Sequence, residues 1–326
     1  MSWDKVFIPN REGKRLAALV FEPEDRARCL VVAAHGFRGS KENGGRIYSL
    51  GQKLAESGGY LVAFDFAGSG ESEGDFTQVT LSGQANDLKD VVNWACSRVD
   101  KPLVLLGRSF GGSTTLVEAS KDERVRGVVL WSTPVFLVET FSAMMPEQFE
   151  AMKKGLEVTI TDDWGEFRLG PGFAADLYNH NMVEYVNRLR DRPVLIVHGL
   201  KDEVVSPQNA RFLGEALREN AEVHLVEGSV LRAPGFVQRL HAGVTALHPG
   251  AEGHDGVRIT GPVAQVRVQI PTSVSPIAAG RILRFPVIPA RPQAHAEQRR
   301  PRAVMLAELA QEPPHVLGLI LVEDGR

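Results

Sequence analysis

Residues 103–112 read LVLLGRSFGG, an order typical of a buried strand, a tight turn and the start of a helix. The apolar run at 103–106 is typical of a strand that is covered on both faces. The turn Gly107-Arg108-Ser109-Phe110-Gly111 fits the pattern G-x-S-x-G, in which a strained backbone lifts a serine hydroxyl above the carboxyl edge of a sheet. Glycine is expected on both sides of this serine, because a Cβ would clash there. The stretch therefore predicts a nucleophile elbow at Ser109.

The composition excludes several classes of function. The chain has 326 residues, of which 43% are hydrophobic and 24% charged, as in a globular protein with one large core. The net charge of −3 predicts no nucleic-acid partner. No apolar run is long enough to span a bilayer, and the charged N-terminus lacks the apolar segment of a secretory signal. We therefore expect a cytoplasmic protein without a membrane partner, in which Cys29 and Cys96 stay reduced and hold no metal.

Short apolar segments alternate with longer amphipathic segments over the first part of the chain. Strands are predicted at 15–22, 29–34, 60–66, 103–106, 125–131, 193–198 and 221–226, and helices at 45–57, 81–96, directly after Ser109 and at 207–217. This alternation predicts an α/β fold with a doubly wound, mostly parallel sheet. Ligands of such sheets bind at the carboxyl ends of the strands, which is where Ser109 falls.

Residues 134–192 interrupt this alternation between two predicted strands. The segment is too long for a plain loop and is rich in aromatic and methionine residues. We interpret it as a helical cap insertion that supplies an apolar pocket for the substrate. An ordinary helical insertion with a small core of its own is the alternative, and the two interpretations are compatible.

An acyl-transfer site also needs preorganised hydrogen-bond donors for the oxyanion. The backbone N–H of Phe110, directly after the nucleophile, is one expected donor. The second is expected in the loop after the predicted strand at 29–34, where Gly36 lets the backbone turn and Phe37 offers its N–H. We expect His35 to brace this loop rather than to take part in catalysis.

The acid of the site is expected after a late strand. Asp202 follows the predicted strand at 193–198 and would accept a hydrogen bond that holds the imidazole of the base in the correct tautomer. Glu203 is the neighbouring alternative, and a helix-capping role for Asp202 is the structural one. His198 is expected to be a packed residue at the end of the strand.

Taken together, these motifs resemble the α/β-hydrolase superfamily, and within it the feruloyl/cinnamoyl esterase-like hydrolases of the serine aminopeptidase (S33) type. The resemblance covers about residues 5–229 and rests on five segments, HGF at 35–37, DFAGSGESEG at 65–74, the elbow at 107–112, and residues 198–207 and 224–229. It implies hydrolysis of a small-molecule carboxylic ester without a cofactor, through an acyl-enzyme on Ser109. It also implies Asp202 as the orienting acid.

The resemblance ends at residue 229. The family has Asp-His after Glu-Gly-Ser/Ala, and that histidine is the general base, whereas here Glu227-Gly228-Ser229 is followed by Val230-Leu231-Arg232. The composition changes at the same point, because residues 230–326 hold 11 of the 19 prolines and no lysine. We therefore predict an α/β-hydrolase domain over residues 1–229, with the cap at about 134–192, and an atypical tail over 230–326.

Three explanations of the missing base remain open. The one we favour is an out-of-frame translation of a GC-rich gene, which would leave the tail irregular or disordered and the enzyme weak or inactive. Alternatively, another histidine replaces the base, with His241 as the nearest candidate and His248 and His254 after it. In the third explanation the chain is a non-catalytic binding protein with a hydrolase fold. The sequence leaves the acyl group, the alcohol and the oligomeric state open.

Overall fold

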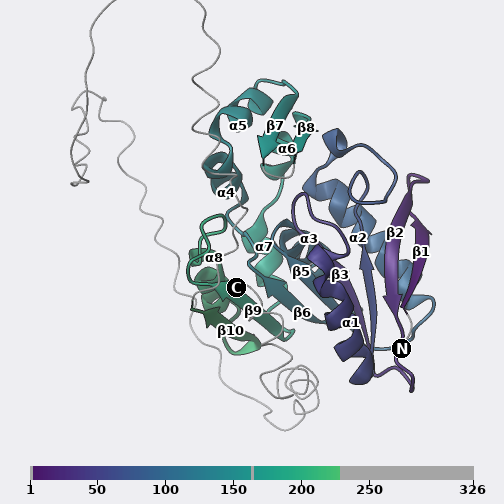
Figure 1. The fold of residues 1–326 in the computed structure, drawn as a ribbon. Helices are drawn as coiled ribbons and strands as arrows, with labels where there is room; N and C mark the ends of the chain where they lie inside the picture. The colour runs from purple at the N-terminus through teal and green to yellow at the C-terminus, as the bar shows by residue number, and fades with distance from the viewer. Residues whose placement is uncertain (1–2, 163–164, 228–326) are drawn as a thin grey trace, which may run out of the picture. The chain divides into compact units, whose positions relative to one another are not determined.

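The computed structural model describes residues 3–162 and 165–227. Eight strands in this part of the chain form one sheet, in the order β1-β2-β4-β3-β5-β6-β9-β10 (Figure 1). Their bounds are β1 Trp3–Pro9, β2 Arg15–Phe21, β3 Cys29–Ala34, β4 Gly59–Phe64, β5 Leu103–Arg108, β6 Val125–Trp131, β9 Val194–Gly199 and β10 Ala221–Val226. β2 runs antiparallel to β1 and β4, and all other neighbours are parallel. The predicted mostly parallel sheet is confirmed.

Helices lie on both faces of the sheet. They are α1 Arg46–Glu56 on one face, and α2 Leu81–Cys96, α3 Phe110–Ala119 and α8 Gln208–Leu217 on the other, with short 3-10 turns at Asn43–Gly45, Phe76–Gln78 and Arg218–Asn220. α1 contributes Ile47 and Leu54 to the smaller of two hydrophobic clusters. The predicted helices agree with these bounds to within one residue at each end, because their apolar stripes face the sheet.

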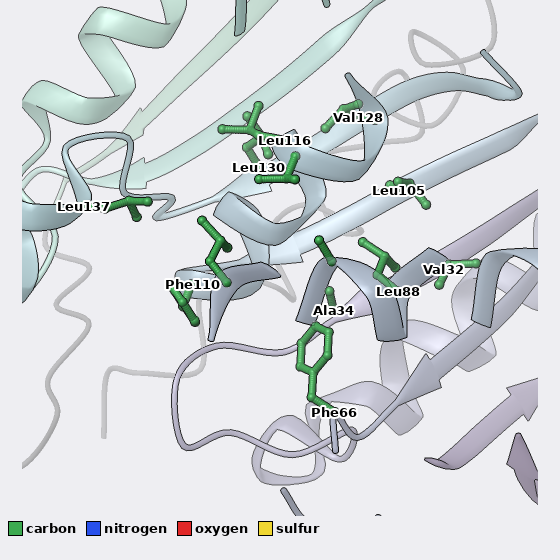
Figure 2. Close-up of a cluster of buried hydrophobic side chains, with 14 of the residues drawn as sticks. Val32, Ala34, Phe66, Leu88, Leu105, Phe110, Leu116, Val128, Leu130 and Leu137 are labelled. Carbon is green, nitrogen blue, oxygen red and sulfur yellow. The ribbon is translucent and has the colours of Figure 1, made fainter. Parts of the chain in front are cut away.

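The larger hydrophobic cluster lies between the sheet and the helices α2, α3 and α8. All six residues of β3 are buried, as the uninterrupted apolar run predicts. Figure 2 shows how Val32 and Leu105 of the sheet face Leu88 of α2 and Leu116 of α3, and all four side chains are fully buried. Burial of each leucine contributes roughly 1.5–3 kcal/mol to stability. This cluster supports the turn between β5 and α3, where Ser109 lies.

The segment between β6 and β9 contains α4 Leu137–Met144, α5 Pro146–Lys153, β7 Val158–Asp162, β8 Gly165–Leu169, α6 Gly172–Leu177 and α7 Met182–Asn187. The expectation of a purely helical insertion is therefore incomplete, because β7 and β8 form an antiparallel hairpin. Along β7, Val158 and Ile160 are buried while Thr159 and Thr161 are exposed. This alternation of β-branched residues favours a strand.

Several other predictions concern properties beyond the sheet. Within residues 3–162 and 165–227, no helix is long and apolar enough to cross a membrane. Cys29 and Cys96 carry free thiols. The boundary at 229/230 and the tail over 230–326 fall outside the described residues, so the division of the chain into a domain and a tail stays a prediction.

Candidate active site

Ser109 lies in the turn that joins β5 to α3, with backbone angles of φ 51° and ψ −125°. A non-glycine residue in this region carries strain of about 1–3 kcal/mol, which neighbouring contacts must hold in place. The Ser109 N–H donates to the Trp131 carbonyl oxygen at 2.8 Å, and the Ser109 carbonyl accepts from the Gly112 N–H at 2.8 Å. This is the backbone geometry that the elbow pattern predicts.

The glycines around Ser109 have no room for a side chain. An added Cβ on Gly107 would lie 2.5 Å from the Gly111 carbonyl oxygen, and one on Gly111 would lie 2.2 Å from the carbonyl oxygen of His35. An added Cβ on Gly112 would lie 1.9 Å from Thr133 Oγ1. Since the contacts of Gly107 and Gly111 are to backbone atoms, the elbow requires glycine at both positions of the pattern.

The loop after β3 runs beside the nucleophile. An added Cβ on Gly36 would lie 3.1 Å from Ser109 Cβ and 3.7 Å from its Oγ. Phe37, the next residue, and Phe110, the first residue of α3, carry the two predicted oxyanion donors. An N–H in the first turn of a helix has no acceptor within the helix, so the Phe110 N–H is available to a substrate. The role of both N–H groups stays a prediction.

His35 braces this loop. Its Nδ1 donates to the Gly36 carbonyl oxygen at 2.8 Å, and its Nε2 accepts from the Phe66 N–H at 3.2 Å. Burial lowers the pKa of the imidazole, so the ring is neutral, with its proton on Nδ1. Both ring nitrogens are used by the backbone, as expected for a structural histidine.

The ring of Phe37 joins the loop to the insertion. It contacts five other phenylalanine rings, with centroids between 5.4 and 6.1 Å away, from Phe76, Phe110, Phe141, Phe167 and Phe173. Three of these residues belong to α4, β8 and α6 of the insertion. The rings of Phe110, Phe141 and Phe173 are almost fully buried. This part of the aromatic segment therefore packs against the oxyanion loop, which holds the insertion beside Ser109.

Asp202 follows β9 and is buried. Its Oδ1 accepts from the N–H groups of Val204 at 3.0 Å and Val205 at 2.8 Å. Its Oδ2 makes no close hydrogen bond among the described residues, although His198 Nε2 lies 3.7 Å away and the Ser132 side chain is near enough to lower the pKa of the carboxyl group. Burial raises the pKa of this carboxyl group, and the two backbone hydrogen bonds oppose that shift. The bonds to Oδ1 therefore fix the orientation of the Asp202 side chain, while Oδ2 can accept a hydrogen bond from a further donor.

His198 lies close to Asp202, with 3.7 Å between its Nε2 and Asp202 Oδ2. The same Nε2 donates to the Val205 carbonyl oxygen at 2.8 Å. β6 lies between β5 and β9 in the sheet, so His198 and Ser109 are two strand spacings apart, roughly 10 Å between backbones. At that separation His198 does not take a proton directly from Ser109, in agreement with its predicted packing role.

Unsatisfied polar atoms gather where β6 and β9 end. Within the described part of the chain, Ser132 Oγ, Thr133 Oγ1, His198 Nδ1 and Asp202 Oδ2 are buried and lack a hydrogen-bond partner. Each such atom costs about 1–3 kcal/mol in a purely structural setting. Thr133 lies against Gly112 of the elbow, and Ser132 follows Trp131, whose carbonyl oxygen accepts from the Ser109 N–H, so two of these four residues adjoin the elbow.

The predicted base cannot be placed, because His241, His248 and His254 all lie outside the described residues. Sequence reasoning also missed the buried charge of Lys41, whose Nζ lies 2.8 Å from Asp65 Oδ2 at the far end of the oxyanion loop. Asp65 is the first residue of the segment DFAGSGESEG at 65–74, and this segment is the sequence feature that could have indicated the ion pair.

A strained serine at the carboxyl edge of this sheet, beside a glycine loop and a buried carboxylate, is the arrangement that the sequence predicts for an α/β-hydrolase fold. The family model described as serine aminopeptidase, S33, matches residues 25–165. The solved structure of Est1E from Butyrivibrio proteoclasticus with bound ferulic acid superimposes with a TM-score of 0.58, covering 73% of this chain and 95% of that one at 22% identity. The chain has the α/β-hydrolase fold, and residues 25–165 match this hydrolase family.

Two curated relatives are similar to this chain. The protein YfhR of Escherichia coli (strain K12), whose function is uncharacterised, is 25% identical over 225 residues, which cover 68% of this chain. The serine hydrolase BPHL of Mus musculus is 28% identical over 181 residues, which cover 51% of this chain and 61% of that protein. The match spans 66% of YfhR, just under two thirds of its length.

Proposed function

We propose that this protein is a serine hydrolase of the carboxylesterase type, similar to feruloyl and cinnamoyl esterases. The observation that carries the proposal is the strained backbone of Ser109, with φ 51° and ψ −125°, between β5 and α3. Such strain persists where a function requires it, and here it presents the hydroxyl at the edge of the sheet where ligands bind.

The proposed reaction is an acyl transfer in two steps. Ser109 Oγ attacks the ester carbonyl carbon as its proton passes to a base, and the N–H groups of Phe37 and Phe110 stabilise the oxyanion, each contributing about 3–4 kcal/mol. The alcohol leaves with a proton from the protonated base, and a water molecule then hydrolyses the acyl-enzyme on Ser109. The free oxygen of Asp202 supports a role in holding an imidazole N–H, and His241 is the candidate that supplies this ring.

The proposed substrate is a small ester with an aromatic acyl group. The ring cluster around Phe37 gives the neighbourhood of Ser109 an apolar, aromatic character. Ferulic acid, an aromatic acid, is bound in the similar structure Est1E. We further propose that the protein acts in the cytoplasm, and that residues 1–229 form the hydrolase domain with the cap at about 134–192.

Hydrolysis of methyl ferulate and p-nitrophenyl butyrate by the full chain and by Ser109→Ala tests this proposal. We expect turnover by the wild type that Ser109→Ala lacks, since loss of the nucleophile costs on the order of 10⁶ in kcat. Equal rates for the two proteins would overturn the enzyme proposal. His241→Ala must remove turnover to a similar degree if His241 is the base.

A second candidate is a non-catalytic binding protein, which the replacement of the family's Asp-His by Val230-Leu231 favours. A binding protein would take up ferulic acid, measured by titration calorimetry, without hydrolysing the ester. It would also fail to react with a fluorophosphonate, whereas a hydrolase would be labelled covalently on Ser109.

A further inference from the structure

The two ends of the oxyanion loop are attached to two consecutive residues, Asp65 and Phe66. At the first end, His35 Nε2 accepts from the Phe66 N–H at 3.2 Å. At the second end, the Lys41 N–H donates to Asp65 Oδ1 at 2.6 Å. Asp65 and Phe66 directly follow β4, so the loop over residues 35–41 is pinned at two points to the edge of the sheet.

The second point is a buried ion cluster. The Lys41 side chain is fully buried, and its Nζ lies 2.8 Å from Asp65 and 2.7 Å from each of Glu42 and Glu71. Burial alone lowers the pKa of Lys41, but its hydrogen bonds to the three carboxylates outweigh burial and raise that pKa. The lysine is therefore charged, and the contact is a true ion pair.

Asp65 is itself held rigidly. Its N–H donates to the Ala17 carbonyl oxygen of β2 at 2.8 Å, and its Oδ2 accepts from the Glu71 N–H at 2.9 Å. An added Cβ on Gly70 would lie 2.3 Å from Asp65 Oδ2, so the turn at Gly70 closes tightly over the carboxylate. Because these contacts fix Asp65 relative to the sheet, they also fix the end of the loop that is bound to Asp65.

The loop between the two points is strained. Arg38 has a φ of 54°, which a non-glycine residue keeps only where its surroundings hold it. On the same loop, Gly36 contacts Ser109, and Phe37 lies between Gly36 and the strained residue. We propose that Lys41 and Asp65, together with His35, are positioning residues that fix the Phe37 N–H beside Ser109. This inference rests on the proposed serine hydrolase function.

A positioning role can be separated from a contribution to stability. Lys41→Met and Asp65→Leu each leave a buried charge without its main partner, which destabilises a fold, whereas the double variant removes both charges. We therefore expect a lower unfolding midpoint for each single variant and a recovery in the double variant. Asp65→Leu also removes the acceptor of the residue-41 N–H, which Lys41→Met keeps, so the loop loses this attachment in Asp65→Leu and in the double variant, and its position there should not recover with the stability.

The first readout needs no activity. Hydrogen exchange of the Gly39 amide, which donates to the Gly36 carbonyl oxygen at 2.9 Å, should become faster by about 10–100-fold in Asp65→Leu and in the double variant, and by less in Lys41→Met, as followed by NMR. Amides of β3 should exchange as in the wild type in the double variant. Lys14→Met, which breaks an exposed pair with Glu12, is the matched control and should leave the exchange of the loop unchanged.

The second readout is the division of the effect between kcat and KM for p-nitrophenyl butyrate. A displaced donor should lower kcat by about 10–100-fold with KM within about threefold, because the donor acts on the oxyanion and not on the ground state. The proposal is overturned if the double variant regains wild-type exchange and kcat along with its stability. If the wild type shows no hydrolysis that depends on Ser109, the proposed function fails. The amide exchange alone then decides whether Lys41 and Asp65 hold the loop in position.

Discussion

Gly36 lies against Ser109 so closely that a Cβ on the glycine would be 3.1 Å from Ser109 Cβ and 3.3 Å from the Arg108 carbonyl oxygen. Both contacts are shorter than ordinary van der Waals separations, and the second one is to backbone. The loop after β3 can therefore approach the elbow after β5 this closely because Gly36 has no side chain.

Gly36→Ala should therefore affect the site more than the fold. The added methyl group must push the loop away from Ser109 by a few tenths of an ångström, which displaces the Phe37 N–H. We expect kcat for p-nitrophenyl butyrate to fall by about tenfold or more, with a loss of stability of about 1 kcal/mol.

Gly172→Ala on α6 is the matched control, since an added Cβ there meets only Thr80 Cγ2 at 3.8 Å. It should leave kcat unchanged and should not lower the stability, since alanine is favoured over glycine in a helix. A Gly36→Ala protein with wild-type kcat would show that the approach of the two loops does not matter for the reaction.

Ser109→Gly and Ser109→Ala should differ in stability although both lack the nucleophile. Alanine keeps the cost of a positive φ at this position, whereas glycine adopts the same angle without strain. We expect Ser109→Gly to be more stable than Ser109→Ala by about 1 kcal/mol, measured by urea unfolding. The greater freedom of glycine in the unfolded chain works in the opposite direction, so equal stabilities would mean that the strain at Ser109 is small.

The sheet could be predicted from the sequence because parallel strands buried on both faces appear as continuous apolar runs. β3, in which all six residues are buried, coincides with its predicted bounds for this reason. β1 was missed, because it is an edge strand on which Trp3 and Phe7 are 47% and 45% exposed and only Ile8 is fully buried. Its pairing with β2 depends on backbone hydrogen bonds, which leave no hydrophobic pattern.

The strained turn at Ser109 and the position of Asp202 after β9 were predictable because their patterns are local, while the catalytic roles of both residues stay predictions. The ion pair between Lys41 and Asp65 was not predictable, because a lysine in a glycine-rich loop is normally solvated. Its partner Asp65 is also 24 residues away in the sequence. Packing of two separate loops decides that pair, so the residue types alone do not reveal it. The base remains a prediction, since the local pattern that would identify it is missing after Ser229.

Asp176 should stabilise the attachment of α6 to α2 in a pH-dependent way. It accepts from the Ser82 N–H at 2.9 Å and the Ser82 hydroxyl at 2.7 Å, and it lies 3.2 Å from His180 Nε2. Burial alone raises the pKa of Asp176, but these hydrogen bonds outweigh burial and lower it. A carboxyl group with a lowered pKa stabilises the fold above its unfolded pKa of about 3.9, and this contribution is lost as pH falls through the folded pKa.

Asp176→Asn should therefore be less stable than the wild type at pH 7 by about 1–2 kcal/mol, since charged hydrogen bonds are replaced by neutral ones. The difference should begin to narrow below about pH 4, where the unfolded chain takes up the proton, and should vanish as pH falls through the lower pKa of the folded state. Urea unfolding at a series of pH values measures this. A difference that stays constant with pH would mean that the charge of Asp176 has no part in the attachment.

Glu118 should destabilise the fold at high pH. It is only 3% exposed on α3, and its Oε1 has no hydrogen-bond partner among the described residues. Burial, and then the charge of Asp122, raise its pKa to about 7. A carboxyl group whose folded pKa is raised favours the folded state less as pH rises from the unfolded pKa to the folded one, because the buried group must ionise.

Glu118→Gln should thus be more stable than the wild type at pH 8, by on the order of 1–3 kcal/mol, and the advantage should shrink toward pH 5, where the wild-type carboxyl is neutral. The exposed Glu123→Gln variant on the following turn is the matched control and should show no such pH dependence. Thermal or urea unfolding between pH 5 and 8 would measure both variants beside the wild type. A wild type that is as stable as Glu118→Gln at pH 8 would mean that the buried carboxylate has found compensating partners and titrates near its ordinary pKa.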